Sequence, residues 1–321
     1  MNERIVILDA FTLNPGDLSW DPLLQVGSLT VYEHTAEHEV IERIKDATLV
    51  LTNDTPLSSE AIRCASELRY IGVMSTGYDA VDVEAAHERN IVVTNIPAYS
   101  TWSVAQMTFA LLLELCHHAG HHDAQVHQGR WSASRDFCFC DYPGIELHGK
   151  TFGIVGYGPI GETVAQIARA FGMKVLVYTR NAHLRDSDED IKFVPLTQLF
   201  ASSDIISFHV PAKRETVNMV NKKTISLMKP SVILINTARG ALFDEEAVTE
   251  ALINGDIGAV ATDVMRHEPP HTSDVLLDAP HCIITPHIAW ATTEARTRCV
   301  EIACNNVISF LNGHTVHTVK S

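Results

Sequence analysis

A chain of 321 residues is longer than one hydrophobic core usually supports, so two domains are expected. Its net charge of −15 argues against a general affinity for nucleic acid or for an anionic membrane surface. A hydrophobic content of 46% is typical of a globular protein, and no apolar run reaches the roughly 20 residues that a membrane span needs. The seven scattered cysteines, without a visible export signal, predict free thiols and a cytoplasmic location.

Short runs of β-branched residues alternate with amphipathic stretches in the first half of the chain, a rhythm typical of a parallel α/β sheet. Five strands are expected there, over residues 4–10, 29–34, 47–53, 68–74 and 91–96. Ser100 or Thr101 can cap a long helix that runs through residue 118. This helix is apolar nearly all round, which predicts burial between domains or subunits.

A second α/β block begins at Gly149. Its strands are expected over residues 150–156, 174–179, 204–210, 231–237, 258–264 and 282–287. Residues 292–311 predict one closing helix, which could pack on either block.

The strand at 150–156 leads into a glycine-rich turn and then into a helix, the context that a dinucleotide-binding motif requires. The motif comprises Gly156, Tyr157, Gly158, Pro159, Ile160 and Gly161. In such a motif Gly156 makes the tight turn, Gly158 lets the backbone approach a pyrophosphate, and Gly161 lets helix and strand pack closely. The helix N-terminus then offers free N–H groups to the phosphates.

The second strand of this block ends in Thr179 and Arg180, where NAD-binding chains usually carry Asp or Glu. That acid binds the ribose hydroxyls and repels a 2′-phosphate. Arg180 can instead pair with a phosphate, and His183 and Arg185 follow it closely. The pair therefore favours NADP(H), although Arg180 could also face solvent or the adenine ring while NAD binds without its acid.

Three chemically active side chains follow later strands of the same block. Arg239, Asp263 and His287 each stand at a strand's carboxyl end, and Glu268 comes five residues after Asp263. Ligands of doubly wound sheets bind outside the carboxyl ends of the strands, so these groups are expected to converge on one edge.

Six stretches, taken in order, resemble the D-isomer-specific 2-hydroxyacid dehydrogenases. They are "STGYDAVD", "VTNIPAYSTWSVAQ", "GYGPIG", "LINTARG", "DVMRHEP" and "TPHIAW". The resemblance covers nearly the whole chain. It implies two doubly wound parallel-sheet α/β domains, one flavodoxin-like and one of the Rossmann type, with the active site in the cleft between them. The substrate-binding domain would comprise residues 1–101 and 289–321, and the dinucleotide-binding domain residues 102–288.

The resemblance also assigns catalytic roles. Arg239 would hold the substrate's carboxylate and carbonyl oxygen with paired donors. His287 would be the general acid in reduction and the general base in oxidation, with Glu268 fixing its tautomer and raising its pKa. The backbone N–H groups of Thr76 and Gly77 would bind the carboxylate.

Further positions are implied around the cofactor. Asp263 would bind the nicotinamide carboxamide and Thr101 would lie near the nicotinamide ring. The other cofactor-binding positions implied are His209, Val210, Pro211, Thr216, Thr237 and Ala238. The chain departs from the family where an aromatic residue and an acid are common, since it has Met265 and Arg266 there, and this could alter the loop that carries Glu268.

Trp290 can form one wall of a small polar pocket, and "PHIAW" is similar to the glycerate dehydrogenase subgroup. The implied reaction is NAD(P)H-dependent reduction of hydroxypyruvate, or of glyoxylate, to the D-2-hydroxy acid. The alternatives are a D-lactate-type dehydrogenase and, in another class, a nucleotide-sensing binding protein on the same fold. The apolar helix and the resemblance both favour a homodimer.

Residues 117–127 are rich in histidine. On one continuous helix His117 and His121, and also His118 and His122, would be four residues apart, a spacing that can bind zinc. Gly120 weakens that helix and no third ligand is evident, so no metal is expected.

Overall fold

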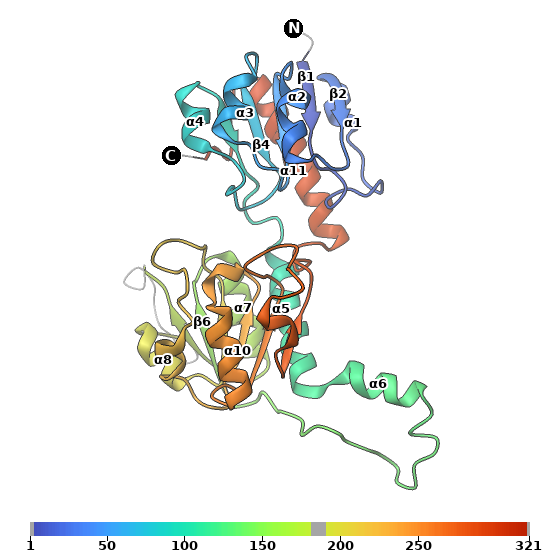
Figure 1. The fold of residues 1–321 in the computed structure, drawn as a ribbon, viewed down its shortest axis with the longest axis vertical. Coiled ribbons are helices and arrows are strands. Elements are labelled where there is room, and N and C mark those ends of the chain that lie inside the picture. The colour runs from blue at the N-terminus through green and yellow to red at the C-terminus, as the bar shows by residue number, and fades with distance from the viewer. Residues whose placement is uncertain (1–2, 181–190, 320–321) are drawn as a thin grey trace. The chain divides into compact units, whose positions relative to one another are not determined.

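The computed structural model describes residues 3–180 and 191–319, and the chain divides into two compact units. Unit 1 combines Met1–Ser100 with Ala291–Ser321, and unit 2 is Thr101–Trp290. The colours of Figure 1 show that unit 1 is built from both ends of the chain.

Unit 1 contains a parallel sheet of five strands in the order β2-β1-β3-β4-β5. The strands are β1 (Glu3–Ile7), β2 (Gly27–Val31), β3 (Leu49–Thr52), β4 (Tyr70–Val73) and β5 (Val92–Thr94). This is the flavodoxin-like order. All residues of β3 and β4 are buried, which explains why these segments are nearly continuous runs of apolar residues.

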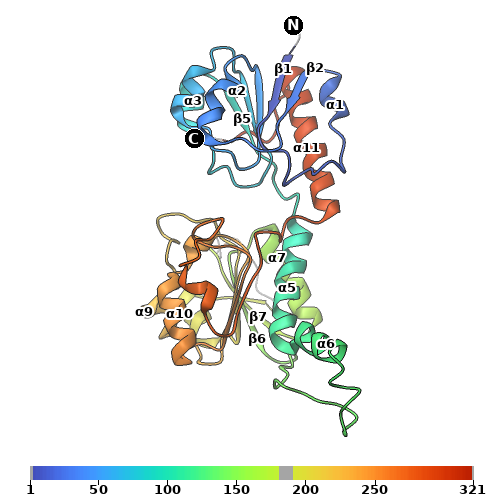
Figure 2. The same ribbon diagram turned by 45° about the vertical axis from the view of Figure 1, so that its right-hand side comes forward.

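The helices of unit 1 cover both faces of its sheet (Figure 2). They are α1 (Asp21–Leu24), η1 (Glu37–Glu39), α2 (Val40–Ile44), α3 (Ser59–Cys64), α4 (Val83–Glu88) and α11 (Thr293–Leu311). Side chains of Ser58, Asp82 and Thr292 cap α3, α4 and α11 by accepting backbone N–H groups. The closing helix α11 packs against α1 and β4, and its Arg296 forms an ion pair with Asp17 at 2.7 Å.

Unit 2 contains a parallel sheet of seven strands in the order β12-β11-β10-β9-β6-β7-β8. They are β6 (Thr151–Val155), β7 (Lys174–Tyr178), β8 (Ile191–Phe193), β9 (Ile205–Phe208), β10 (Ile233–Asn236), β11 (Ala259–Thr262) and β12 (Cys282–Ile284). The direction of strand succession reverses between β6 and β9, which is the Rossmann arrangement. The expected fold class, two doubly wound parallel α/β domains, is thus confirmed.

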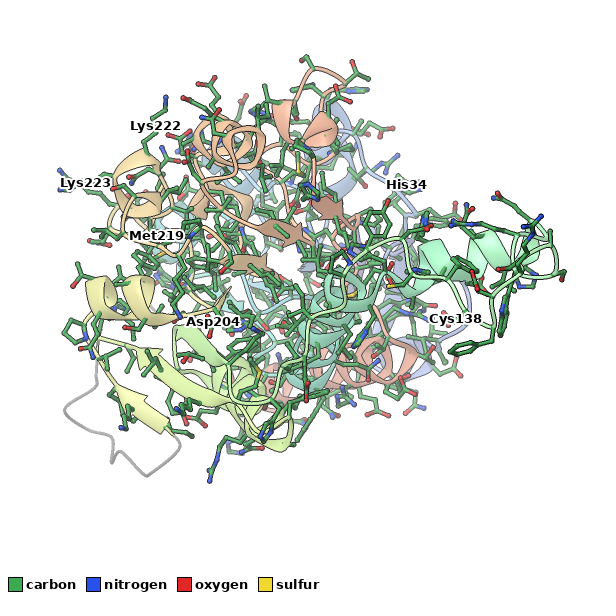
Figure 3. The ribbon with its side chains drawn as sticks, turned by 90° about the horizontal axis from the view of Figure 1, so that it is seen from below. His34, Cys138, Asp204, Met219, Lys222 and Lys223 are labelled. Atoms are coloured by element: carbon green, nitrogen blue, oxygen red, sulfur yellow. The ribbon has the colours of Figure 1, made fainter. Side chains whose placement is uncertain are left out.

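Two hydrophobic cores lie on the two faces of this sheet. The helices are α5 (Thr101–His117), α6 (Ala119–His127), α7 (Pro159–Ala170), α8 (Leu196–Ser202), α9 (Lys222–Ile225), η3 (Gly240–Leu242), α10 (Glu245–Asn254) and η4 (Val275–Asp278). Helices α5 and α7 supply one core, and α8, α9 and α10 the other. Figure 3 shows Lys222 and Lys223 pointing away from the second core at the surface of α9.

Helix α5 owes its all-round apolarity to packing within unit 2. It packs on α7 and on β10 and β11, and Phe109 stacks between Phe152 and Phe171 at ring distances of 5.7 and 5.5 Å. The burial expected between domains or subunits is therefore largely burial within one unit.

Helix α6 and the loop that follows it, residues 119–144, form a segment that we call the arm. The arm projects from the rest of unit 2 in two views (Figures 1 and 2), and Cys138 lies on it in Figure 3. Several of its large apolar side chains are exposed, among them Trp131 at 50% and Phe137 at 90%.

The helix expected through residue 118 is confirmed as α5, which ends at His117. The expected spacing of the histidines on one helix was wrong, because His118 has a left-handed φ of 49° and His117 and His121 lie on separate helices. Strand β8 was not expected, because it is only three residues long and follows a polar stretch. His183 and Arg185 lie outside the described residues. Within those residues no helix is both long and apolar enough to cross a membrane.

Candidate active site

The glycine-rich turn leaves β6 at the point where the strand order of unit 2 reverses. Gly156 has a φ of 101°, a conformation that L side chains rarely adopt. A Cβ atom there would overlap the carbonyl oxygen of His209, and one at Gly161 would overlap that of Gly156. A Cβ atom at Gly158, by contrast, would meet nothing within 4 Å.

These three glycines fit a dinucleotide. Gly156 and Gly161 are required for close backbone contacts within the protein, whereas the open space at Gly158 lies at the N-cap of α7. A pyrophosphate in that space would meet the free N–H groups of the first helical turn. Pro159 starts the helix without losing a hydrogen bond, while Tyr157 and Ile160 pack on the adjoining core.

No acid stands at the end of β7. The strand ends at Tyr178, Thr179 is half-buried and Arg180 is exposed. The geometry therefore offers a cation and a hydroxyl where an NAD-binding chain usually has a carboxylate.

The loop after β9 borders the glycine-rich turn. His209 Nε2 lies 2.9 Å from Ser207 Oγ, and burial lowers the pKa of His209 to about 3, so its imidazole is neutral. Thr216 Oγ1 donates to the carbonyl of Pro211 at 2.7 Å and closes the loop on itself. Val210 packs on the core beside the turn.

Arg239 follows β10, as expected, and is half-buried. Its Nη1 donates to the carbonyl of Ala238 at 2.8 Å, and its own carbonyl accepts from Asn236 Nδ2 at 2.9 Å. Thr237 lies 3.3 Å, between hydroxyl oxygens, from Thr108 of α5. These contacts fix the backbone from which the guanidinium extends.

Asp263 is 1% exposed and organises the turn that carries His287. Its carboxylate accepts the hydroxyl of Thr285 at 2.5 Å and the N–H groups of Ile288 and Ala289 at 3.0 and 2.8 Å. Its carbonyl oxygen accepts the N–H of His287 at 2.8 Å. Burial raises the pKa of Asp263, while these hydrogen bonds act in the opposite direction. The sequence predicted Asp263 only as a cofactor ligand, and its role in holding the turn of His287 was not predicted.

His287 and Glu268 form a close polar pair. Nδ1 of His287 lies 2.5 Å from Oε2 of Glu268, and the other carboxylate oxygen accepts the N–H of Met265 at 2.8 Å. With Nδ1 facing the carboxylate, Nε2 is the ring nitrogen left to exchange a proton with a ligand. The side chains are 43% and 36% exposed, so a ligand can reach them.

The electrostatics of the pair follow from this geometry. The hydrogen bond that His287 makes to the Glu268 carboxylate raises the pKa of His287 above its ordinary value, whereas burial and the positive charge of Arg239 act in the opposite direction. For Glu268, burial alone would raise the pKa, but the hydrogen bond and charge of His287 outweigh it and the pKa is lowered. Arg239 also contributes to this lowering, so the three side chains act on one another electrostatically.

The remaining predicted site residues are Thr76 and Gly77 of unit 1 and Thr101 and Trp290 of unit 2. In unit 1 the turn after β4 is pinned by Thr76 Oγ1, which donates to the carbonyl of Ile96 at 2.9 Å. Among the described residues, the backbone N–H groups of Thr76 and Gly77 donate no hydrogen bond, so they are available to an anion. In unit 2, Thr101 begins α5 and Trp290 ends the unit, and both are partly buried.

The histidine-rich segment is held by hydrogen bonds and ring contacts. His121 Nε2 lies 2.7 Å from Asp141, and His122 Nδ1 lies 2.8 Å from the carbonyl of His118. Nη1 and Nη2 of Arg130 donate to the two carboxylate oxygens of Asp141, at 2.5 and 2.7 Å. No group of three His, Cys, Asp or Glu side chains that could hold a metal occurs in the described parts of the chain.

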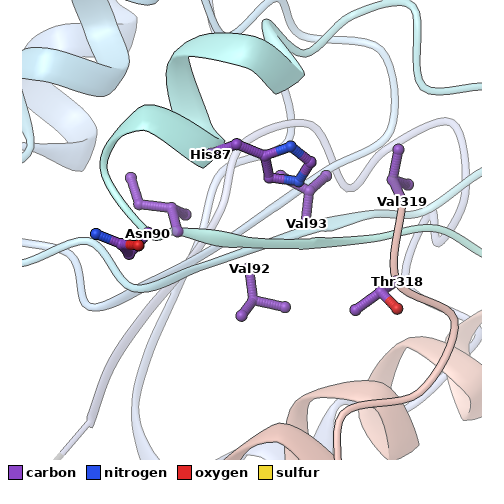
Figure 4. Close-up of a pocket in the computed structure, with 7 residues that line it drawn as sticks. His87, Asn90, Val92, Val93, Thr318 and Val319 are labelled. Carbon is purple, nitrogen blue, oxygen red and sulfur yellow. The ribbon is translucent and has the colours of Figure 1, made fainter. Parts of the chain in front are cut away.

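A cavity of about 320 Å³ lies apart from these residues, within unit 1. Figure 4 shows it beside β5, between His87 of α4 and the C-terminal residues Thr318 and Val319. The C-terminal segment pairs there with the edge of the sheet, since the N–H of Val319 donates to the carbonyl of Val93 at 2.9 Å. None of the predicted site residues lines it.

Comparison with known proteins identifies the family. Residues 109–289 match the model of the NAD-binding domain of D-isomer specific 2-hydroxyacid dehydrogenases. The chain is 46% identical over 320 residues to a hydroxypyruvate reductase of Blautia hydrogenotrophica, covering 99% of both chains. It is 36% identical over 293 residues to a glycerate dehydrogenase of Methylorubrum extorquens, covering 90% of this chain and 91% of the relative.

A solved structure extends the comparison to the whole fold. An acyclic imino acid reductase in complex with NADPH and D-Arg superposes with a TM-score of 0.86 at 30% identity, covering 99% of this chain and 100% of the other. With a full-length relative at 46% identity and a matching family model, the chain belongs to the D-isomer specific 2-hydroxyacid dehydrogenases, oxidoreductases that use a nicotinamide cofactor.

Proposed function

We propose that this protein reduces hydroxypyruvate to D-glycerate, with glyoxylate as a second substrate. The observation that carries the proposal is the His287–Glu268 pair, which is electrostatically coupled to Arg239 and follows strands of the same sheet as the dinucleotide turn. The names of the relatives, hydroxypyruvate reductase and glycerate dehydrogenase, support this choice of substrate over pyruvate.

The catalytic roles follow from the chemistry of the three side chains. The bound nicotinamide supplies the hydride. Arg239 binds the carboxylate and carbonyl oxygen of the keto acid, because its planar fork of donors matches two oxygens at once. His287 donates a proton from Nε2 to the carbonyl oxygen, and Glu268 stabilises the imidazolium before the transfer.

The remaining contacts hold the substrate and the cofactor. The N–H groups of Thr76 and Gly77 bind the substrate's carboxylate, and Trp290 forms a wall of its pocket. Thr101 and Asp263 lie at the nicotinamide end of the cofactor. Asp263 would bind the cofactor while its buried carboxylate also holds the turn that carries His287.

The cofactor is NADP(H) in this proposal. Arg180 pairs with the 2′-phosphate, and the neutral Thr179 does not repel it. The exposed position of Arg180 at the end of β7 supports this role, as does the similarity to the acyclic imino acid reductase whose structure holds NADPH.

A homodimer in the cytoplasm completes the proposal. The arm leaves large apolar side chains in water, including Trp131 and Phe137, and such a surface is stabilised when a second copy of the chain covers it. The seven cysteines are all free, which suits a reducing compartment.

The test is a comparison of initial rates with hydroxypyruvate, glyoxylate and pyruvate, followed by chiral analysis of the product. We expect hydroxypyruvate to have the highest kcat/KM and to give D-glycerate. A higher kcat/KM for pyruvate would replace this function with that of a D-lactate dehydrogenase.

A further inference from the structure

The turn from Met265 to Glu268 carries the partner of His287. Glu268 accepts the N–H of Met265 through Oε1 and faces His287 through Oε2, at 2.8 and 2.5 Å. The carboxylate is therefore aimed by the backbone of its own turn. Any movement of Met265 or Arg266 would be passed directly to the His287 contact.

This turn is anchored from outside by Glu245. Oε1 of Glu245 accepts the backbone N–H of Arg266 at 2.8 Å. Glu245 is the first residue of α10, and the helix itself is fixed, because Asp244 caps it and Ala247 and Val248 are buried in the core. The anchoring side chain therefore extends from a helix that is itself packed in the core.

The other side of the turn is closed by backbone contact. A Cβ atom at Gly240 would overlap the carbonyl of Met265 and the N–H of Arg266, so η3 abuts the turn directly. The guanidinium of Arg266 adds a further tether by donating to Asn218 Oδ1. The turn therefore sits between η3 and α10, with the Glu245 hydrogen bond as its tie to the helix.

We propose that Glu245 is a positioning residue, which holds the N–H of Arg266 and thereby fixes the turn that aims Glu268 at His287. This inference deepens the proposed function and rests on the roles assigned there to Glu268 and His287. The positioning depends on the length of the Glu245 side chain and on its acceptor oxygen, not on its charge.

Two kinds of substitution separate reach from charge. Glu245→Asp keeps the charge but shortens the side chain, and Glu245→Ala removes the acceptor, so both lose the bond. Glu245→Gln keeps the reach and an acceptor oxygen while losing the charge. Glu246→Asp is the matched control, because Glu246 is the next residue of α10 and is exposed.

The first readout is the pKa of His287 itself, followed by NMR titration of its imidazole and assigned by the signal's absence in His287→Gln. The charged groups acting on this imidazole are Glu268, Asp263 and Arg239. We expect a lower pKa in Glu245→Asp and Glu245→Ala than in the wild type, because the Glu268 contact loosens. Glu245→Gln and Glu246→Asp should match the wild type.

The second readout is kinetic. A small misplacement of a catalytic group commonly costs about 10- to 100-fold in rate, so kcat with hydroxypyruvate should fall by that order in Glu245→Asp and Glu245→Ala. The KM should change much less, since Arg239 is untouched. An unmoved His287 pKa in both variants, or a loss in Glu245→Gln as large as in Glu245→Ala, would overturn the proposal. Absence of hydroxypyruvate turnover in the wild type would instead reject the proposed substrate, while the NMR titration would still decide the role of Glu245.

Discussion

The Nδ1 atom of His287 lies 2.5 Å from Oε2 of Glu268, and the two side chains follow neighbouring strands, β12 and β11. Glu268 raises the pKa of His287, so the imidazole stays protonated to higher pH than a free histidine would. In reduction this extends the pH range in which a proton is available. In oxidation the neutral imidazole, which must accept the proton, forms only at higher pH.

Replacement of Glu268 by Gln should lower the pKa of His287, because the carboxylate that stabilises the imidazolium is lost. In the oxidation of D-glycerate the imidazole must be neutral, so the acidic limb of the kcat/KM profile should move to lower pH. In reduction the imidazolium must be present, so the basic limb should also move to lower pH. Limbs that stay in place would show that Glu268 is not the group that sets this pKa.

Thr179→Asp should convert the preference for NADPH into one for NADH. The new carboxylate would accept hydrogen bonds from the ribose hydroxyls and repel a 2′-phosphate. The measurement is kcat/KM for each cofactor at saturating hydroxypyruvate, with Thr179→Asn as the uncharged control. A wild type that already prefers NADH would mean that Arg180 does not bind a phosphate.

Two substitutions in the glycine-rich turn should separate an effect on stability from an effect on cofactor binding. Gly161→Ala places a Cβ atom against the carbonyl of Gly156, and such overpacking typically lowers the free energy of unfolding by about 1–3 kcal/mol. Gly158→Ala meets no protein atom within 4 Å, so its thermal unfolding should match the wild type. Its NADPH affinity should fall at least about tenfold, because the methyl group occupies the approach of the pyrophosphate. Unchanged affinity in Gly158→Ala would place the cofactor elsewhere.

The arm should be the contact between two copies of the chain. Phe137 is 90% exposed, and Phe137→Asp would put a charge into a surface that association buries. Light scattering after size exclusion should then show a monomer, whereas Phe11→Asp, at an exposed aromatic of unit 1, should leave the dimer intact. A wild type that is already monomeric at micromolar concentration would contradict the homodimer.

Much of the fold could be predicted because buried parallel strands need continuous apolar runs. The segments around β3, β4, β9 and β10 are such runs, and all their residues are buried. Gly120 indicated a weak point near the end of the long helix, but the left-handed conformation of His118 could not be predicted, because no glycine or asparagine stands at that position. Strand β8 was missed for a related reason, since it pairs with β7 over only three residues.

The residues of the candidate site could be predicted where a reactive side chain directly follows a strand. Arg239 and His287 follow β10 and β12, so their convergence on one sheet edge follows from parallel topology. The role of Asp263 in holding the His287 turn required the structure, because its partners are backbone N–H groups 25 and 26 residues away. The role of Glu245 could not be predicted either, because the hydrogen bond that suggests it joins its side chain to the backbone N–H of Arg266, 21 residues later.

The role of His287 is tested most directly by the initial rate of hydroxypyruvate reduction by the wild type and by His287→Gln, each saturated with NADPH. We expect D-glycerate formation by the wild type and a kcat lower by about 10²- to 10⁴-fold in the variant, the usual contribution of a positioned general acid. NADPH binding, followed by cofactor fluorescence, should be unchanged. A variant that turns over hydroxypyruvate at the wild-type rate would contradict the assignment of His287 as the proton donor.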